Sequence, residues 1–375
     1  MAPIPDSPRS AISASRPPVH SGDVHAARGR DVRDDTEVTT SADRAERTEH
    51  TEGTEGTEGT AEVLGGEVHL AYARRAASGL VTVAAGFTPR AARARAERRA
   101  TALDALHAIP GSRPDPDDDV RELSLADFMP EPPADIEARV AGIGLLSGDR
   151  YALPAEIVWL GDRDGRVEPT AVGVPDDGED GAIADLLAHD MVTRWWTSPR
   201  APLLRVSEHL ARLIPEGAAA AASLLGLRVS VFLLPGPDFQ IAVAGVSGDG
   251  ATIAAAAART ARAAVEEAFL RAIAARAQPW STLPVADSLR RLTVWHREND
   301  YLAYLEWSAL EADPAAVEAM GVGVASPSWA EIATRRFGHE PVLVTAFGHA
   351  VKVVCPGAAC YRTAPPGTPL PCPVP

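Results

Sequence analysis

Two pairs of charged side chains stand at a spacing that could support chemistry. Asp185 and His189 lie four residues apart in a helix predicted over residues 180–196, and Glu267 and Arg271 repeat that spacing further on. Residues four apart share one face of a helix, so each pair can act at a single point. Asp185 and His189 could form a residual metal or acid–base pair, and the alternative is a solvated helix face. For Glu267 and Arg271 the alternative is a salt bridge on the helix surface.

The elements that position these pairs alternate between helices and strands. Helical periodicity gives the helix over residues 180–196 a buried face made of Ile183, Leu186, Leu187, Met191 and Trp195. Further helices are predicted over residues 89–107 and 252–277, the second of them carrying Glu267 and Arg271. Short apolar runs predict strands over residues 67–72, 79–84, 153–160, 227–234, 239–246, 292–296, 301–307, 341–346 and 350–355. This interleaving predicts a mixed α/β (α+β) fold in a single domain.

The two ends of the chain differ in composition from its middle. Residues 1–62 contain no leucine and no aromatic residue, and three Thr-Glu-Gly units follow one another from Thr51 to Gly59. Such a segment buries too little apolar surface to offset the entropy of ordering it. We therefore predict a disordered low-complexity tail over residues 1–62, a domain over residues 63–375, and a proline-rich C-terminal tail over residues 364–375 within that domain.

Composition excludes several classes of function. The formal net charge of −15 argues against nucleic acid and anionic membranes as partners. Lys352 is the only lysine, which leaves no phosphate-binding loop of the GxxxxGK[ST] type and no plausible Schiff-base lysine. The chain shows no secretory signal and no apolar run of membrane-spanning length. Cys355, Cys360 and Cys372 make no disulfide framework, which favours a cytoplasmic protein, and a metal site on Cys355 and Cys360 is a weak alternative.

Four segments follow one another in an informative order. They are Gly86-Phe-Thr-Pro89 with its arginine-rich helix, Asp185 to Met191 with Arg194-Trp-Trp196 behind it, Glu266-Glu-Ala268 in the helix after Gly250, and Val351 to Gly357 with the terminal Pro371-Cys-Pro-Val-Pro375. Together they resemble the YcaO family, whose members modify peptide backbones. The proline-rich end resembles the azoline-forming branch of that family.

The resemblance implies an ATP-dependent cyclodehydration. In that chemistry a Cys, Ser or Thr side chain of a peptide attacks the preceding carbonyl, and ATP phosphorylates the resulting oxyanion, so that phosphate leaves and an azoline ring remains. By resemblance, Asp185 and Glu267 would be the Mg²⁺ ligands, and the terminal Pro371, Pro373 and Pro375 would thread toward the active site. The whole set that the resemblance assigns to ATP and Mg²⁺ is Asp185, His189, Asp190, Arg194, Glu267 and Arg271.

The sequence departs from the family where the charges should cluster. The Glu-x-x-Glu-Arg pattern of the family occurs nowhere in the chain. In the helix over residues 180–196, Asp185, Ala188 and His189 stand at its three positions, so one shortened carboxylate remains. In the helix over residues 89–107, Arg99, Ala102 and Leu103 take these positions. Each lost charged hydrogen bond weakens ligand binding by about 1.5–3 kcal/mol.

These departures lead to three hypotheses for the function. The first is a catalytically degenerate YcaO-like scaffold or partner subunit in a machinery that makes thiazole- or oxazole-type rings on ribosomal peptides. The second is a divergent but active ATP-dependent cyclodehydratase, and the third is an unrelated α/β ligand-binding protein. The family readings imply four partners: a precursor peptide, a leader-binding protein that resembles an adenylating enzyme, an intact YcaO protein and a flavin dehydrogenase.

Overall fold

The computed structural model describes residues 59–75, 79–108, 119–128, 138–158, 178–248, 250–278, 301–320, 327–346 and 349–358. All of them belong to one compact unit, Thr51–Pro375. The predicted tail up to residue 58, the strand predicted over residues 292–296 and the terminal prolines lie outside the described residues. The division into a tail and one domain therefore stays a prediction.

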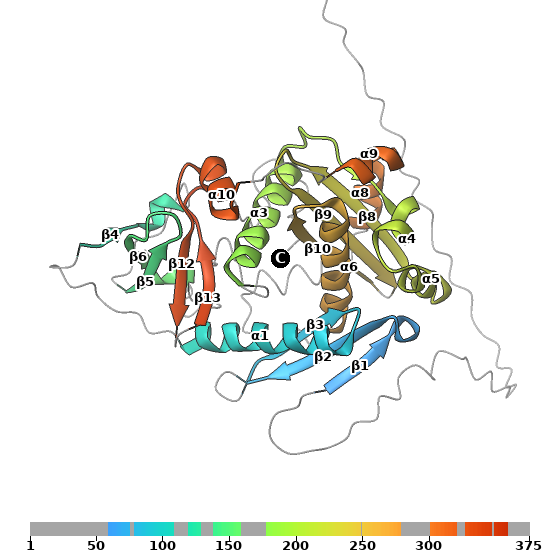
Figure 1. Ribbon diagram of the computed structural model, residues 1–375, viewed down its shortest axis with the longest axis horizontal. Helices are drawn as coiled ribbons and strands as arrows, with labels where there is room; N and C mark the ends of the chain where they lie inside the picture. Colours follow the sequence, from blue (N-terminus) through green and yellow to red (C-terminus); the bar gives the residue numbers. More distant parts are fainter. Residues whose placement is uncertain are drawn as a thin grey trace, which may run out of the picture. The chain divides into compact units, whose positions relative to one another are not determined.

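The strands of the described ranges form three sheets (Figure 1). The first has the order β1 (Gly59–Val63), β2 (Val68–Arg74), β3 (Val81–Gly86). The second has the order β10 (Gly250–Ala258), β9 (Gln240–Gly248), β8 (Arg228–Pro235), β7 (Leu204–Arg205), β11 (Leu310–Glu311). The third has the order β13 (His349–Val354), β12 (Val342–Ala346), β5 (Arg139–Gly144), β6 (Arg150–Pro154), β4 (Arg121–Glu122). Neighbouring strands are antiparallel except β7–β11 and β4–β6, which are parallel.

Helices connect and cover these sheets, which confirms the mixed α/β fold. The described helices are α1 (Pro89–Ala108), α2 (Ala155–Val158), α3 (Gly178–Thr197), α4 (Leu210–Leu213), α5 (Glu216–Leu224), α6 (Ala261–Ala277), α8 (Tyr301–Ser308), α9 (Pro314–Ala319) and α10 (Trp329–Phe337), with short 3-10 turns at Leu64–Gly66, Leu125–Asp127 and Ser207–His209.

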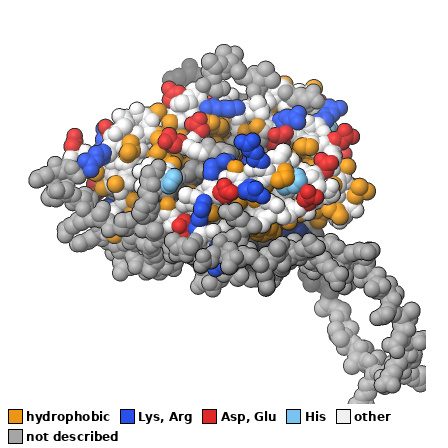
Figure 2. Space-filling view, turned by 60° about the horizontal axis from the view of Figure 1, so that its bottom comes forward, with side chains coloured by type: hydrophobic (Ala, Val, Ile, Leu, Met, Phe, Trp, Pro, Cys, Tyr) orange, Lys and Arg blue, Asp and Glu red, His pale blue; other side chains and the backbone are white. Residues whose placement is uncertain are grey.

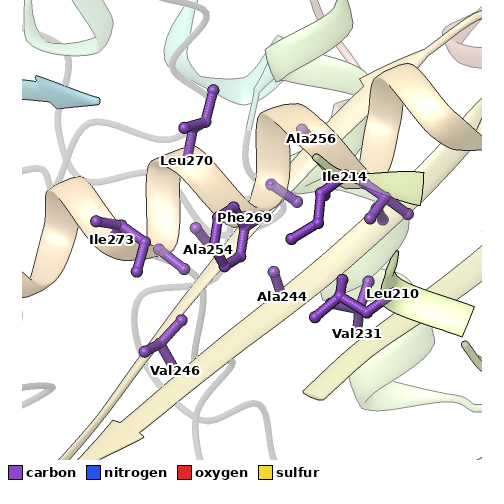
Figure 3. Packing of buried hydrophobic residues seen from close by; sticks show 14 of the residues in the cluster. Leu210, Ile214, Val231, Ala244, Val246, Ala254, Ala256, Phe269, Leu270 and Ile273 are labelled. Atoms are coloured by element: carbon purple, nitrogen blue, oxygen red, sulfur yellow. The ribbon is translucent and has the colours of Figure 1, made fainter. Parts of the chain in front are cut away.

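The second sheet is covered on both faces. Alternate residues of a strand point to opposite faces, and here both sets are apolar. Val231, Ala244 and Ala254 belong to the cluster that packs against α6 (Figure 3). Their neighbours Phe232, Val243 and Ile253 belong to the cluster that contains the apolar face of α3. The helices α6 and α3 therefore lie on opposite faces of the second sheet, which has β10 at one edge.

A stripe of alanines lets α1 approach the first sheet closely. Ala92, Ala96 and Ala100 recur every four residues and pack with small residues of β2 and β3, such as Ala73 and Ala84. The C-terminal half of α1 contributes larger side chains, including Leu106, to the core of the third sheet. One helix thus links the first sheet to the third.

The largest error of the sequence prediction concerns residues 252–277. They were predicted as one helix, but residues up to Ala258 form β10, which pairs with β9 along its whole length. Alanine favours a helix in isolation, and here the tertiary pairing overrides that local preference. The helix α6 begins only after Thr260, whose side chain accepts a hydrogen bond from the Ala263 amide at 3.1 Å.

Two predicted strands are helices wholly or in part. Residues 301–307, predicted as a strand, belong to α8, whose buried Tyr301, Leu302 and Leu305 share one helical face. In the strand predicted over residues 153–160, β6 ends at Pro154 and the chain turns into α2. Short buried apolar runs fit either structure, so periodicity does not separate them.

Most of the other predicted elements are confirmed within a few residues: α1, α3, β2, β3, β8, β9, β12 and β13. The first strand starts at Gly59, four residues inside the predicted tail. Its side chains are mostly exposed, and it is held by main-chain pairing with β2, so it carries little hydrophobic signal.

Candidate functional site

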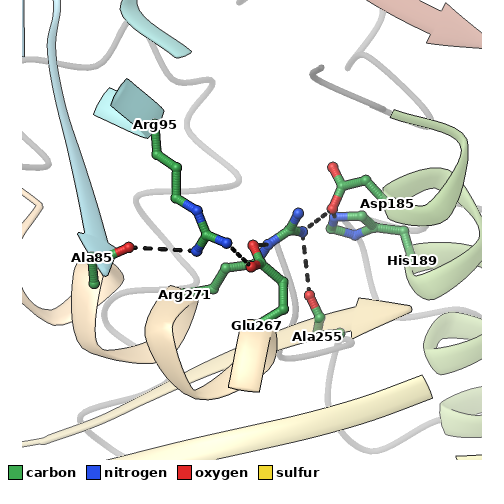
Figure 4. Close-up of polar contacts among 7 residues, drawn as sticks. All are labelled: Ala85, Arg95, Asp185, His189, Ala255, Glu267 and Arg271. Carbon is green, nitrogen blue, oxygen red and sulfur yellow. Dashed lines mark hydrogen bonds and ion pairs between the residues drawn. The ribbon is translucent and has the colours of Figure 1, made fainter. Parts of the chain in front are cut away.

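Four charged side chains from three helices form a chain of alternating charge (Figure 4). Arg95 of α1 contacts Glu267 of α6, with its Nη2 2.8 Å from Oε2. The other carboxylate oxygen of Glu267 accepts from Nε of Arg271 at 2.8 Å. Nη1 of Arg271 then donates to Oδ1 of Asp185 on α3. We call these four residues the α1–α6–α3 ion-pair chain.

The edge of β10 explains how α6 and α3 can meet at all. They lie on opposite faces of the second sheet, and β10 is the strand at its edge. Arg271 reaches around that edge, where its Nη1 also donates to the Ala255 carbonyl of β10 at 3.4 Å. On the other side of the cluster, Nη1 of Arg95 donates to the Ala85 carbonyl of β3 at 3.5 Å. The ion-pair chain thus satisfies main-chain carbonyls of two sheets.

Both carboxylates in this chain are held in the charged form. Burial raises the pKa of Glu267, but the Arg271 and Arg95 guanidinium groups lower it more, so its pKa falls below its ordinary value. The pKa of Asp185 is lowered in the same way, because burial is outweighed by Arg271 and then by His189. The arginines therefore compensate carboxylates that burial alone would neutralise.

The structure tests the two structural alternatives, a solvated helix face for Asp185 and His189 and a surface salt bridge for Glu267 and Arg271. Asp185 is only 9% exposed, so the solvated helix face predicted as the alternative for Asp185 and His189 is wrong. Nε2 of His189 lies 3.9 Å from Oδ1 of Asp185, which is too long for a direct hydrogen bond. Glu267 and Arg271 do form the predicted salt bridge, but four-fifths of each side chain is buried, so it is not a surface pair.

The remaining two residues of the predicted nucleotide set form a separate cluster. Asp190 is fully buried and accepts from Nε of Arg194 at 2.8 Å and from Nε of Arg336 at 2.6 Å. Arg194 also donates to the Gly357 carbonyl at 2.7 Å. Asp190 and Arg194 therefore tie α3 to α10 and to the turn after β13.

The paired tryptophans that follow Arg194 are core residues, which confirms the buried position predicted for Trp195. Trp195 and Trp196 are each 7% exposed and belong to the cluster under α3. Nε1 of Trp195 donates to the Ala201 carbonyl at 3.0 Å, and Trp196 packs against Tyr301 with ring centroids 5.7 Å apart. Pro371, Pro373 and Pro375 lie outside the described residues.

Two arginines that complete these clusters were not predicted. Arg95 lies on α1, four residues before Arg99, which also contributes to lowering the Asp185 pKa. That spacing was a usable signal for a basic helix face. Arg336 is 146 residues away from its partner Asp190 in the sequence, and no local sequence pattern predicts a contact over that separation.

The described residues do not offer a ready metal site. In the ranges that the structure covers, no three His, Cys, Asp or Glu side chains are grouped so that they could hold a metal ion. Cys355 is buried and its thiol donates to the His339 carbonyl at 3.3 Å, while Cys360 lies outside the described residues. Among the described helices, none is long and apolar enough to cross a membrane.

Comparison with known proteins identifies the fold. No family model and no curated protein matches the sequence. The structure is similar to YcaO from Methanopyrus kandleri, solved with AMPPCP and Mg²⁺ bound, with a TM-score of 0.54, 17% identity, and coverage of 83% of this chain and 90% of that one. It is also similar to a chain of the E. coli microcin synthetase McbBCD complex, with a TM-score of 0.58, 11% identity, and coverage of 88% and 99%.

A third similar structure is a heterocyclase in complex with substrate and cofactor. Its TM-score is 0.54 at 13% identity, and the match covers 78% of this chain and 48% of that one. At such low identities the comparisons establish the fold alone: this chain has a YcaO-like fold.

Proposed function

We propose that this chain is a YcaO-like component of a cytoplasmic machinery that installs azoline-type rings on a ribosomal peptide. Within that machinery it acts as a non-catalytic scaffold or partner subunit. The observation that carries the proposal is that the predicted ATP and Mg²⁺ residues pair with one another: Arg271 bonds to both Glu267 and Asp185, and Arg194 bonds to Asp190.

The pathway part of the proposal is supported by the fold. The similar E. coli chain belongs to a microcin synthetase complex and is covered almost completely, at 99% of its length. The similar heterocyclase was solved with substrate and cofactor bound. Fold likeness alone is a weak guide to function, so the ordered sequence segments that resemble the azoline-forming branch carry equal weight.

The non-catalytic part is supported by the contacts of the charged residues. A magnesium–triphosphate needs carboxylates for the metal and cations for the phosphates. Here Arg271 bonds to Glu267 and Asp185, and Arg194 bonds to Asp190. Binding a nucleotide through these groups would first require breaking charged hydrogen bonds worth about 1.5–3 kcal/mol each.

The partners follow from the same proposal. A scaffold subunit needs a leader-binding protein that resembles an adenylating enzyme, an intact YcaO protein to supply the ATP reaction, and the precursor peptide itself. A flavin dehydrogenase would oxidise the rings afterwards. The terminal prolines would then serve as a docking element. On the face shown in Figure 2, basic and acidic side chains are interspersed among apolar ones.

Titration calorimetry of the full chain with ATP and Mg²⁺ tests the proposal. We expect no binding in the micromolar range and no phosphate release when the precursor peptide is added. In a reconstitution with an intact YcaO protein from the same gene cluster, omitting this chain should slow the loss of one water per ring. Micromolar ATP binding with peptide-dependent phosphate release would instead favour the divergent active cyclodehydratase. A reconstitution that runs equally well without this chain would remove it from the pathway.

A further inference from the structure

We infer that Arg271 is the resident cation of this site. Its guanidinium group holds together two carboxylates, Glu267 and Asp185, that the family resemblance assigns to a divalent metal ion. The M. kandleri protein of the same fold was solved with Mg²⁺. In the present chain Arg271 of α6 takes the place of a metal ion between the two carboxylates, and it joins α6 to α3.

The geometry of the guanidinium group suits it to this role. It is planar and presents several N–H donors in a fixed fork, so it can serve two carboxylates at once. Nε points to Glu267 at 2.8 Å, and Nη1 points to Asp185 and to the Ala255 carbonyl (Figure 4). The three acceptors come from α6, α3 and β10, as the ligands of a bridging ion would.

Charge balance leaves no demand for a second cation. The ion-pair chain contains two guanidinium groups, Arg95 and Arg271, and two carboxylates, Glu267 and Asp185. Arg99 adds further positive potential near Asp185. A divalent ion entering between the carboxylates would have to displace Arg271 and leave its charge in a mostly buried place, which is strongly unfavourable. The residues present therefore do not fit a divalent ion while Arg271 is in place.

A latent property follows from this arrangement. Removing the Arg271 side chain would leave Asp185 and Glu267 near each other, with Arg95 still in contact with Glu267 and with His189 and Arg99 close to Asp185. Hard carboxylate oxygens are what Mg²⁺ and Mn²⁺ prefer. We therefore expect the variant, unlike the wild type, to respond to divalent ions. This inference concerns the site of the proposed function, but it holds whether or not the chain belongs to a peptide-modifying pathway.

Thermal unfolding of the full-length wild type and R271A, each in EDTA, in Mg²⁺ and in Mn²⁺ without nucleotide, tests the inference. The wild-type Tm should be the same in all three conditions. R271A should melt roughly 5–10 °C lower in EDTA, because one partner of a buried ion pair is gone. Millimolar Mn²⁺ should restore part of that loss, and the double variant R271A/D185N should not respond to Mn²⁺.

The same helix supplies a matched control. R262A removes the arginine of the exposed Arg262–Glu266 pair, which has the same four-residue spacing as Glu267 and Arg271. Its Tm should change by no more than about 1–2 °C and should ignore divalent ions. If R271A does not fold, D185N/E267Q replaces it: it should be destabilised and indifferent to Mn²⁺.

Two results would overturn the inference. One is a wild-type Tm that rises with Mg²⁺ or Mn²⁺ alone, and the other is an R271A protein as stable as the wild type. Neither result would bear on whether the chain assists ring formation by an intact YcaO protein. Conversely, a failed reconstitution would leave the metal titration unaffected, so the two proposals fail separately.

Discussion

Substitution of Asp190 distinguishes most clearly whether the predicted nucleotide residues have a structural or a ligand-binding role. Its carboxylate is fully buried and accepts from Arg194 and Arg336 at 2.8 and 2.6 Å. The substitution Asp190→Asn keeps the size of the side chain and removes its charge. The amide can still accept one hydrogen bond, but its NH₂ group faces a guanidinium donor instead of accepting from it.

The expected loss can be estimated from these contacts. Two charge-assisted hydrogen bonds at about 1.5–3 kcal/mol each give a total of about 3–6 kcal/mol. The two arginine side chains are 50% and 30% exposed, so water can replace part of what they lose. Arg194 also keeps its bond to the Gly357 carbonyl. We therefore expect Asp190→Asn to lower the free energy of unfolding by about 3 kcal/mol.

Urea unfolding followed by tryptophan fluorescence measures this loss, because Trp195 and Trp196 lie on the same helix. A matched control is Glu266→Gln on the exposed face of α6, where the charged pair should contribute less than about 0.5 kcal/mol. A loss below about 1 kcal/mol in Asp190→Asn would refute the structural reading of this cluster. If Asp190→Asn were as stable as the wild type and bound ATP differently, Asp190 would instead be a ligand-binding residue.

Three further predictions concern other buried or capping groups. Hydrogen bonds from Ser147, the Leu146 amide and Tyr151 outweigh burial and lower the pKa of Glu340 from 4.5 to about 2. Because the pKa of Glu340 is lower in the folded than in the unfolded state, Glu340 stabilises the fold above pH 4.5 and loses this effect as the pH falls toward 2. The difference in unfolding free energy between the wild type and Glu340→Gln, measured by urea titration, should therefore shrink over that range. Lys352, the only lysine of the chain, is 1% exposed and its Nζ donates to the Ile157 carbonyl at 2.5 Å. Acylation of its amine, measured by mass spectrometry, should therefore occur only as fast as the protein unfolds globally. Rapid labelling in native buffer would contradict the burial of Lys352. Thr260→Ala removes the N-cap of α6 and should lower the unfolding free energy by about 1 kcal/mol in the same urea assay, whereas Thr260→Ser should not.

The sequence predicted the elements whose local pattern and tertiary environment agree. The helix α3 has helical periodicity, and α1 begins after Thr88, whose hydroxyl accepts from the Ala91 amide at 3.2 Å. The hairpin of β8 and β9 has β-branched residues around a turn of Pro and Gly. The alanine-rich segment over residues 252–258 has no such agreement. Its local preference is helical, and only its pairing with β9 makes it a strand. Information about that pairing lies outside the segment.

The site shows the same division between local and distant contacts. The spacing of four residues correctly grouped Glu267 with Arg271, because such a pair depends on one helix alone. Asp190 and Arg194 form an ion pair of the same spacing that was not predicted. The contacts that decide what these pairs do join distant segments. Arg271 and Asp185 are 86 residues apart, and their meeting depends on β10 being an edge strand, which the sequence analysis had missed.

The burial of α3 determines how the charged residues on it must be compensated. This helix is buried on nearly every side, with apolar residues from Ile183 to Trp196 facing the second and third sheets and α10. An aspartate placed in such a helix must be neutralised by protonation or by a partner, because an unpaired buried charge is too costly. Asp185 meets Arg271 and Asp190 meets Arg194 and Arg336, so each carboxylate has a guanidinium partner from another element. A helix that keeps acidic residues for a metal ion has to present them to an open space instead. In this chain, arginines from α6 and α10 bond to those two carboxylates, and that supports reading α3 as a structural helix.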